Sequence, residues 1–229
     1  MLILAIDTSA IASAALLRST RTDGAAEVLA SFASTETNTH AEVLAPAIQG
    51  LLTEAGVAGT GLDRIVAGVG PGPFTGLRVG IATARTLGFA WNVPVDGAMS
   101  LDAIAWDVLA AGEVPAEGFT VAIDARRREL YWARYGADGS LAEGPRVSVP
   151  GSLPAGPVYG AGAGLYADRL AQSGAAAVER FRDRQPTAAS LGAAALRQLA
   201  RGGQLLGTTP LYLRESDAKV PAAMQGHTP

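Results

Sequence analysis

Residues 70–80 form a glycine-rich segment, GPGPFTGLRVG, whose position suggests phosphate chemistry. The segment leaves a strand-like run and enters a helix-like run, which is where phosphate-binding loops usually lie. A Walker-type loop needs a lysine near its end, but the only lysine of the chain is Lys219, far along the sequence. The dinucleotide spacing GxGxxG is absent too, because the pattern GxGxxxG is formed by Gly70, Gly72 and Gly76. The segment therefore lacks the groups that grip a phosphate.

Two prolines shape the same segment. Pro71 and Pro73 have no N–H group, so two donors that a phosphate cradle would use are missing. Each proline also fixes its own φ angle, which stiffens the turn. We predict a rigid turn that is capped by Thr75 and leads into a helix from Gly76.

Small polar residues after two strand-like runs support a second, weaker hypothesis of a nucleotide-binding site. Asp7, Thr8 and Ser9 follow the run LILAI, and Asp124 ends the run FTVAID. Strand-end acids beside hydroxyl groups can hold a metal-bound phosphate. A glycine-rich turn that would let the backbone approach an adenine or a ribose contains Gly160 and Gly162. Plain turns explain these segments equally well.

Hydrolytic and metal chemistry have little support. The chain has two histidines, His40 and His227, and no cysteine. A catalytic triad could use only His40, which no nucleophile signature accompanies. Position 44, one helical turn after His40, is Leu44, so a paired-histidine metal site is excluded. We expect His40 to be a capping or surface residue and predict no metal site.

The composition is that of a globular protein with a small net charge. Of 229 residues, 48% are hydrophobic and 17% are charged, and the formal net charge is −3. A protein that grips nucleic acid alone normally has a basic excess, so we expect any nucleic-acid contact to be shared or indirect. The run Arg126, Arg127 and Arg128 is more simply a solvated face, although a contact with nucleic acid stays open. The absence of cysteine and of a long apolar run favours a cytoplasmic protein.

An internal repeat indicates how these residues are positioned. The strand-like run at residues 2–7 ends in Asp7, and the run at residues 119–124 ends in Asp124. A turn and a second strand-like run follow each acid, at residues 13–17 and 130–134. This pattern, used twice about half a chain apart, predicts two related lobes.

Strands and helices alternate between the repeats. We predict strands at residues 27–32 and 64–69, and helices at residues 76–91, 100–111 and 187–201. A further helix should begin at Thr39, with Glu42 completing a capping box, and end at Gly56. Pro46 lies inside it and predicts a kink or a late start. The tail at residues 215–229 has no apolar period and should be disordered.

The helix after the glycine loop has a row of small residues on one face. They recur every four positions: Gly76, Gly80, Ala84 and Gly88. Interior glycines each cost a helix roughly 1 kcal/mol relative to alanine, so a close neighbour should compensate. That neighbour is either this chain's own sheet or helix, or a helix of a partner.

Several motifs together resemble the TsaB (YeaZ-like) family, over nearly the whole chain up to residue 214. The most specific is GPGPFTGLRVGIATARTLG, which marks the signature loop with Gly70, Gly72, Phe74, Thr75 and Arg78. LAIDTS, HAEVLAP, SLDAIA, IDARRRELYWARY and PLYLR follow the family's order. Pro73 departs from the family, which more often has a small residue there. The resemblance implies an α/β, actin-like ATPase (ASKHA, ribonuclease H-like) fold with two mixed-sheet lobes, at residues 1–100 and 101–214.

The resemblance also implies a function. Members of the family are non-catalytic subunits in the synthesis of N6-threonylcarbamoyladenosine at position 37 of tRNA, and they activate a catalytic paralogue, TsaD. The small ATPase TsaE joins the complex, and homodimers form when TsaD is absent. Partner binding through the N-lobe helices would involve His40, Leu44, Gly76, Gly80, Ala84 and Gly88. The cleft would be degenerate, with weak adenine-nucleotide binding at most, at Asp7, Thr8, Ser9, Asp124, Gly160 and Gly162.

Two enzymatic readings compete with this one. A small-molecule kinase or ATPase of the same fold would use Asp7 and Asp124, but no DxG-type phosphate loop follows Asp7. A glycoprotein endopeptidase, a label attached to some relatives, would need metal-dependent cleavage. The histidine count opposes that reading.

Overall fold

The computed structural model describes residues 1–19, 25–34, 40–112 and 114–214. The capping residue Thr39, the expected tail at residues 215–229 and its His227 lie outside these residues. The side chain of His40 lies outside them as well, although its backbone begins a helix.

The first lobe is built on a five-stranded mixed sheet with the order β3-β2-β1-β4-β5. β1 lies at its centre, antiparallel to β2 and parallel to β4. The antiparallel hairpin β2–β3 forms one side, and β5 pairs in parallel with β4 on the other. The strands are β1 (Leu2–Asp7), β2 (Ser13–Arg18), β3 (Glu27–Ala33), β4 (Arg64–Gly68) and β5 (Val95–Ala98).

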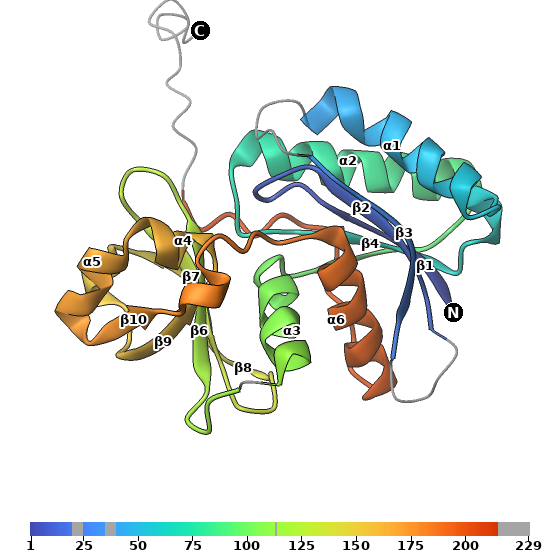
Figure 1. Cartoon of the computed structure of the whole chain (residues 1–229). Coiled ribbons are helices and arrows are strands. Elements are labelled where there is room, and N and C mark those ends of the chain that lie inside the picture. Colours follow the sequence, from blue (N-terminus) through green and yellow to red (C-terminus); the bar gives the residue numbers. More distant parts are fainter. Residues whose placement is uncertain (20–24, 35–39, 113, 215–229) are drawn as a thin grey trace, which may run out of the picture.

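Helices cover both faces of the first sheet (Figure 1). α1 (His40–Glu54) and α2 (Phe74–Trp91) pack on the face that carries Leu4 and Ile6. α6 (Ala188–Ala200) packs on the opposite face, which carries Ile3 and Ala5. Because successive side chains of a strand point to opposite faces, the apolar run of β1 supplies both cores.

The second lobe repeats this topology with a sheet in the order β10-β9-β6-β7-β8. β6 is antiparallel to β7 and parallel to β9, as β1 is to β2 and β4. Its strands are β6 (Phe119–Asp124), β7 (Leu130–Tyr135), β8 (Leu141–Ser148), β9 (Gly156–Tyr159) and β10 (Ala175–Ala177). Its helices are α3 (Leu101–Ala111), α4 (Ala161–Leu165) and α5 (Ala167–Leu170). Among the described residues, short 3₁₀ helices also occur at Gly59–Gly61, Pro150–Ser152, Ala171–Ser173 and Glu179–Phe181.

A final extended segment, residues 204–214, runs back across both lobes, and we call it the strap. Leu206 bridges to Gly97, and the Leu211 amide donates to the Val69 carbonyl at 2.8 Å. At the far end, Arg214 Nη1 donates to the Ala125 carbonyl at 2.8 Å. The strap therefore connects the first sheet with the β6–β7 hairpin of the second lobe.

The two repeated mixed sheets confirm the expected two-lobed fold and the internal repeat. Two details differ from the expectation. Of the kink or late start predicted at Pro46, the late start does not occur, since the helix runs from residue 40 through the exposed Pro46, and the kink stays a prediction. Thr75 is not a cap, because α2 begins at Phe74 and its N-cap is Pro73, which has no side-chain donor or acceptor. The division of the chain at residue 100 stays a prediction. α6 follows that boundary in the sequence, yet it packs on the first sheet.

Candidate functional site

Asp7, the acid at the end of β1, is fully buried, and its carboxylate is occupied by internal hydrogen bonds. The amide and hydroxyl of Ser9 donate to Oδ1 at 2.9 and 2.7 Å. The Ser100 hydroxyl donates to Oδ2 at 2.6 Å, and a Cβ at Gly68 would overlap the same carboxylate. Hydrogen bonds to a charged acceptor satisfy a buried carboxylate. In this position Asp7 holds the turn after β1 and does not face an open cleft.

The signature loop closes over that turn. The Gly70 amide donates to the Ser100 hydroxyl at 3.2 Å, and the Ser100 amide donates to the Gly70 carbonyl at 2.8 Å. Gly72 lies so near the turn that an added Cβ would be 2.8 Å from the Ser9 carbonyl oxygen. A side chain at position 72 would therefore displace Ser9 from Asp7. Asp7 and Ser9 of the predicted cleft and Gly70 and Gly72 of the predicted loop thus lie in one internal cluster.

The row of small residues on α2 belongs to the same cluster. The Thr8 hydroxyl donates to the Gly76 carbonyl at 2.7 Å and accepts from the Gly80 amide at 3.1 Å. A Cβ at Gly80 would overlap the Thr8 hydroxyl, and one at Gly88 would overlap Val95 of β5. The row therefore lets α2 approach this chain's own sheet closely.

This packing corrects the expected partner face. Gly76, Gly80, Ala84 and Gly88 are all buried on the sheet side of α2, and Leu44 is 1% exposed in the core between α1 and the sheet. Side chains buried within one chain cannot also form its contact surface. The side chain of His40, the remaining residue of that set, lies outside the described part of the chain. Any partner of these helices would meet their outer faces instead.

The outer face of α2 is partly covered by the strap. Phe74 stacks on Tyr212 with ring centroids 3.9 Å apart, and Arg78 Nε donates to the Tyr212 hydroxyl at 2.9 Å. Further along, Arg85 donates through Nε to Thr208 Oγ1 and through Nη2 to its carbonyl, both at 2.9 Å. Phe74 and Arg78, predicted as loop residues, therefore anchor the strap.

In the second lobe, Asp124 lies beside a strained turn of three arginines. Its Oδ1 accepts the Arg126 amide at 2.9 Å, and Oδ2 lies 3.7 Å from Arg126 Nη1. Arg126, Arg127 and Arg128 have φ angles of 62°, 54° and 64°. A left-handed residue other than glycine costs roughly 1–2 kcal/mol, so three in succession form a strained hairpin tip.

The glycine turn predicted to approach a nucleotide packs on β6. A Cβ at Gly160 would overlap the Ala122 carbonyl, and one at Gly162 would lie 2.6 Å from the Ile123 backbone and from Leu130. Asp124 contacts Arg126. Burial raises the pKa of the Tyr166 hydroxyl, and the nearby charge of Asp124 raises it further. Asp7 is bound to the signature loop, whereas Asp124 belongs to the arginine turn.

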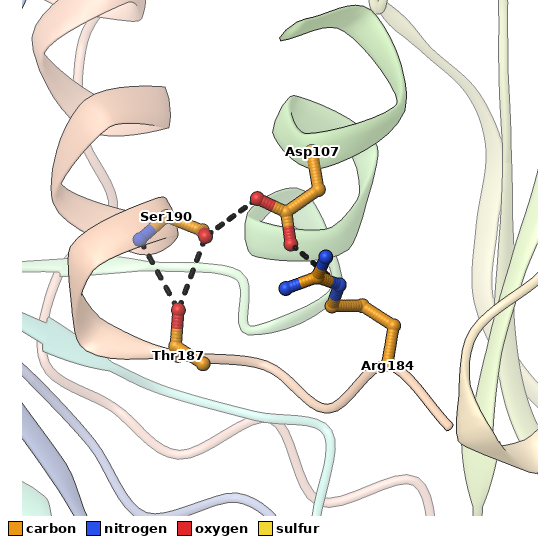
Figure 2. A network of polar contacts seen from close by, with 4 residues as sticks. All are labelled: Asp107, Arg184, Thr187 and Ser190. Atoms are coloured by element: carbon orange, nitrogen blue, oxygen red, sulfur yellow. Dashed lines mark hydrogen bonds and ion pairs between the residues drawn. The ribbon is translucent and has the colours of Figure 1, made fainter. Parts of the chain in front are cut away.

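A polar network joins α3 to α6 beneath the first lobe (Figure 2). Ser190 of α6 donates to Asp107 Oδ1 at 2.6 Å and accepts from Thr187 at 3.0 Å. Arg184 Nε lies 3.5 Å from Asp107 Oδ2. Burial raises the pKa of Asp107, while Ser190 and then Arg184 act in the opposite direction.

Two cavities border the α3–α6 region. One, of about 400 Å³, is lined by Ile11 and by residues between Glu179 and Thr187. The other, of about 480 Å³, lies between α3, α6, the β7–β8 hairpin and the strap. Sequence reasoning missed the second cavity, which carries no motif, and the path of the strap, because the motif PLYLR at residues 210–214 does not show what this segment packs on. In the described part of the chain, no cluster of three or more metal-ligating residues occurs, and no helix is long and apolar enough to cross a membrane.

Comparisons with known proteins identify relatives of this chain in sequence and in structure. The sequence profile described as TsaD, tRNA N6-adenosine threonylcarbamoyltransferase, matches residues 27–225. An uncharacterized protein of Mycobacterium tuberculosis is 40% identical over 193 residues, which are 84% of this chain and 83% of that protein. The tRNA threonylcarbamoyladenosine biosynthesis protein TsaB of Bacillus subtilis is 34% identical over 62% of this chain and 58% of its own length.

A solved structure extends the likeness over almost the whole chain. YeaZ from Pseudomonas aeruginosa has a TM-score of 0.75 and is 33% identical, covering 93% of this chain and 99% of its own. Profile, sequence and structure therefore lead to one assignment. The chain belongs to the TsaD/YeaZ-like family that includes the proteins named TsaB.

Proposed function

We propose that this chain is a non-catalytic subunit in the synthesis of N6-threonylcarbamoyladenosine at position 37 of tRNA, where it binds and activates a catalytic TsaD paralogue. The observation that carries the proposal is the internal occupation of Asp7. Its two carboxylate oxygens accept three hydrogen bonds from Ser9 and Ser100, with no exposed surface. A metal-bound phosphate needs such an acid to be open to the cleft. The function would then lie in what the chain binds.

The outer face of α1 and α2 is the surface we propose for the paralogue. Phe89 on α2 is 91% exposed, the highest value among the exposed large hydrophobic residues of the described chain. The exposed positions of the two helices include small residues, Ala45 and Gly50 on α1 and Ala82, Thr86 and Ala90 on α2, beside longer side chains such as Gln49 and Arg85. A projecting aromatic ring on a helical surface that also carries small residues is suited to helix–helix packing.

Replacing this ring tests the docking face. Phe89→Glu should abolish co-elution with the paralogue and lower tRNA modification in a reconstituted reaction by at least tenfold. Leu165→Glu is a matched control, because Leu165 is 59% exposed on α4 of the other lobe. Normal co-elution of the Phe89→Glu protein would show that the docking face is assigned wrongly. If tRNA modification proceeds equally well without this chain, the proposed function itself is wrong.

The same face would form a homodimer when the paralogue is absent. Sedimentation of the isolated chain should then give a dimer that Phe89→Glu converts to a monomer. The small ATPase TsaE would join the complex, and tRNA would be contacted mainly through the assembly in the cytoplasm. The proposal requires no cofactor. The chain would bind adenine nucleotides weakly at most.

A kinase or ATPase of the same fold is the second candidate. It requires magnesium-dependent ATP turnover by the isolated chain that disappears in Asp7→Ala. The hydrogen bonds of Asp7 oppose it, since the acid would have to leave Ser9 and Ser100 to reach a metal. We expect no turnover above a buffer blank. The endopeptidase reading needs a metal that the described residues have no cluster to hold.

A further inference from the structure

The 480 Å³ cavity beside α3 lies apart from the Asp7 cluster and from the proposed docking face. It is bounded by two helices, a hairpin and the strap, so both lobes contribute to its wall. Ligand sites occur preferentially at such junctions, and their volumes are typically about 300–1,000 Å³. This cavity therefore has the place and size of a site for a small molecule.

The wall of the cavity is apolar and partly aromatic. Trp106 and Leu109 come from α3, Leu141 comes from the β7–β8 hairpin, and Leu206 and Leu211 come from the strap. The Arg197 guanidinium lies over the Trp106 ring, 6.0 Å from its centroid. A flat aromatic molecule would bury apolar surface against these side chains.

One carboxylate oxygen opens onto the cavity. Asp102 lies in the first turn of α3 and lines the cavity, and its Oδ1 accepts the Tyr135 hydroxyl at 2.8 Å. No described residue donates a hydrogen bond to Oδ2. Oδ2 is not among the buried polar atoms that lack a partner, so it is open to solvent, and a ligand that donates there would replace water at a carboxylate oxygen.

Positive charge borders the cavity on α6. Arg197 is half-buried and also donates through Nη2 to the Asp138 carbonyl at 2.9 Å, whereas Arg201 is exposed. Burial lowers the pKa of Arg197, the nearby charge of Arg201 adds to that effect, and Asp138 acts in the opposite direction. An anion between them would relieve this repulsion.

We propose that this cavity binds a small aromatic anion that also carries a hydrogen-bond donor. The ring lies against Trp106 and the strap leucines, the donor faces Asp102 Oδ2, and the anionic group pairs with Arg197 and Arg201. The site goes beyond the proposed role in the tRNA-modifying complex and does not depend on it.

A matched pair of probes tests the ligand class on the full chain. Indole-3-acetate has the ring, the donor and the anion, whereas indole-3-acetamide lacks only the charge. Titration followed by the Trp106 indole N–H resonance should give saturable shifts for both, with the acetate bound at least fivefold more tightly. Equal affinities would overturn the anionic part of the proposal. The absence of saturable shifts with either probe would overturn the site.

Variants locate the binding. Ala194 lines the cavity and Ala200 lies on the same helix outside its lining. Ala194→Phe should weaken acetate binding at least tenfold, whereas Ala200→Phe should leave it unchanged. Arg201→Gln, at an exposed position, should lower the affinity for indole-3-acetate several-fold without changing the affinity for indole-3-acetamide. This variant tests the site if Ala194→Phe fails to fold. Binding that is insensitive to both Ala194→Phe and Arg201→Gln would place the probe elsewhere and overturn the proposal.

Discussion

Gly80 is the residue at which α2 comes closest to the turn after β1. A methyl group there would overlap the Thr8 hydroxyl, which bonds both the Gly76 carbonyl and the Gly80 amide. Gly80→Ala should therefore destabilise the chain by about 1–3 kcal/mol through overpacking, despite the better helix propensity of alanine. Chemical denaturation would measure the change.

Gly50 supplies the matched control for that experiment. It lies inside α1, and a Cβ added there meets no atom within 4 Å. Gly50→Ala should stabilise the chain by roughly 0.5–1 kcal/mol, because only the helix propensity changes. If both substitutions stabilise the chain equally, the close approach of α2 to Thr8 is wrong.

Asp102 should make stability depend on pH between about 4 and 6. Burial raises the pKa of Asp102 from 3.8 to about 6, with the Tyr135 hydrogen bond acting weakly in the opposite direction. The folded chain then binds more protons than the unfolded chain in this interval, so its stability falls as pH rises from 3.8 to 6. The loss is at most about 3 kcal/mol and is complete above the folded pKa.

Asp102→Asn removes this titration and keeps an acceptor for Tyr135. The difference in unfolding free energy between variant and wild type should therefore change across that pH interval and level off on both sides of it. Asp168→Asn, at an exposed position of α5, controls for the removal of one carboxylate. A constant difference for Asp102→Asn from pH 3.5 to 7 would contradict the raised pKa.

At the scale of elements, the strap is held to α2 at two places, through Thr208 on Arg85 and through Tyr212 on the first turn of the helix. Tyr212 stacks on Phe74 and accepts from Arg78, and Arg78 also lies over both rings. Tyr212→Ala should lose about 1–2 kcal/mol from the stack and the hydrogen bond. The Leu211 amide, which donates to Val69, should then exchange its hydrogen faster by about tenfold.

Tyr212→Phe separates the two contributions. It keeps the ring stack and removes only the acceptor of Arg78, so it should give a smaller increase in exchange. Amides in the middle of β1 should be unaffected by either change, since β1 pairs with β2 and β4 and not with the strap. If exchange rises equally throughout the sheet, the strap is part of one cooperative unit with it.

Elements of this fold were predictable where a strand or helix carries its own pattern. The apolar runs at β1 and β6, each followed by an acid and a returning strand, gave correct strands and the two-lobed repeat. The start of α2 was misplaced, because Thr75 is a good capping residue in general, whereas the fixed φ of Pro73 begins the helix earlier. Local propensity could not decide between these neighbours.

The candidate site was less predictable because it depends on contacts between distant segments. Whether Asp7 faces a cleft or is enclosed depends on Gly70, Gly72 and Ser100, which come much later in the chain. The small-residue row of α2 correctly required a close neighbour, but spacing alone could not say whether that neighbour was a sheet or a partner. The strap has no periodic apolar pattern, so its path was not predicted.

At the scale of the whole molecule, charge limits what the chain can do with tRNA alone. With a formal net charge of −3, the isolated chain should bind tRNA no more tightly than roughly 10⁻⁵ M at physiological salt. Three arginines at the β6–β7 tip could still add a local contact within a complex. Filter binding at about 50 and 150 mM salt would measure both the affinity and its electrostatic share.

Replacing Arg126 and Arg128 with glutamine distinguishes local from general attraction. The double variant should lower tRNA affinity within the reconstituted complex more than replacement of two other exposed arginines, Arg18 and Arg146. If both double variants lose tRNA affinity equally, the hairpin tip contributes only its charge. Submicromolar binding of tRNA by the isolated chain would contradict the view that tRNA contact is shared.

The position of α6 has a consequence for the synthesis of this protein on the ribosome. The first sheet is complete in sequence at β5, but α6, which covers its second face, is translated about 100 residues later. At roughly 5–20 residues per second, that face waits roughly 5–20 s for its cover. During this interval the nascent chain presents Ile3, Leu17 and Val66 to solvent, so chaperones that bind apolar strands would find their target before the second lobe is finished.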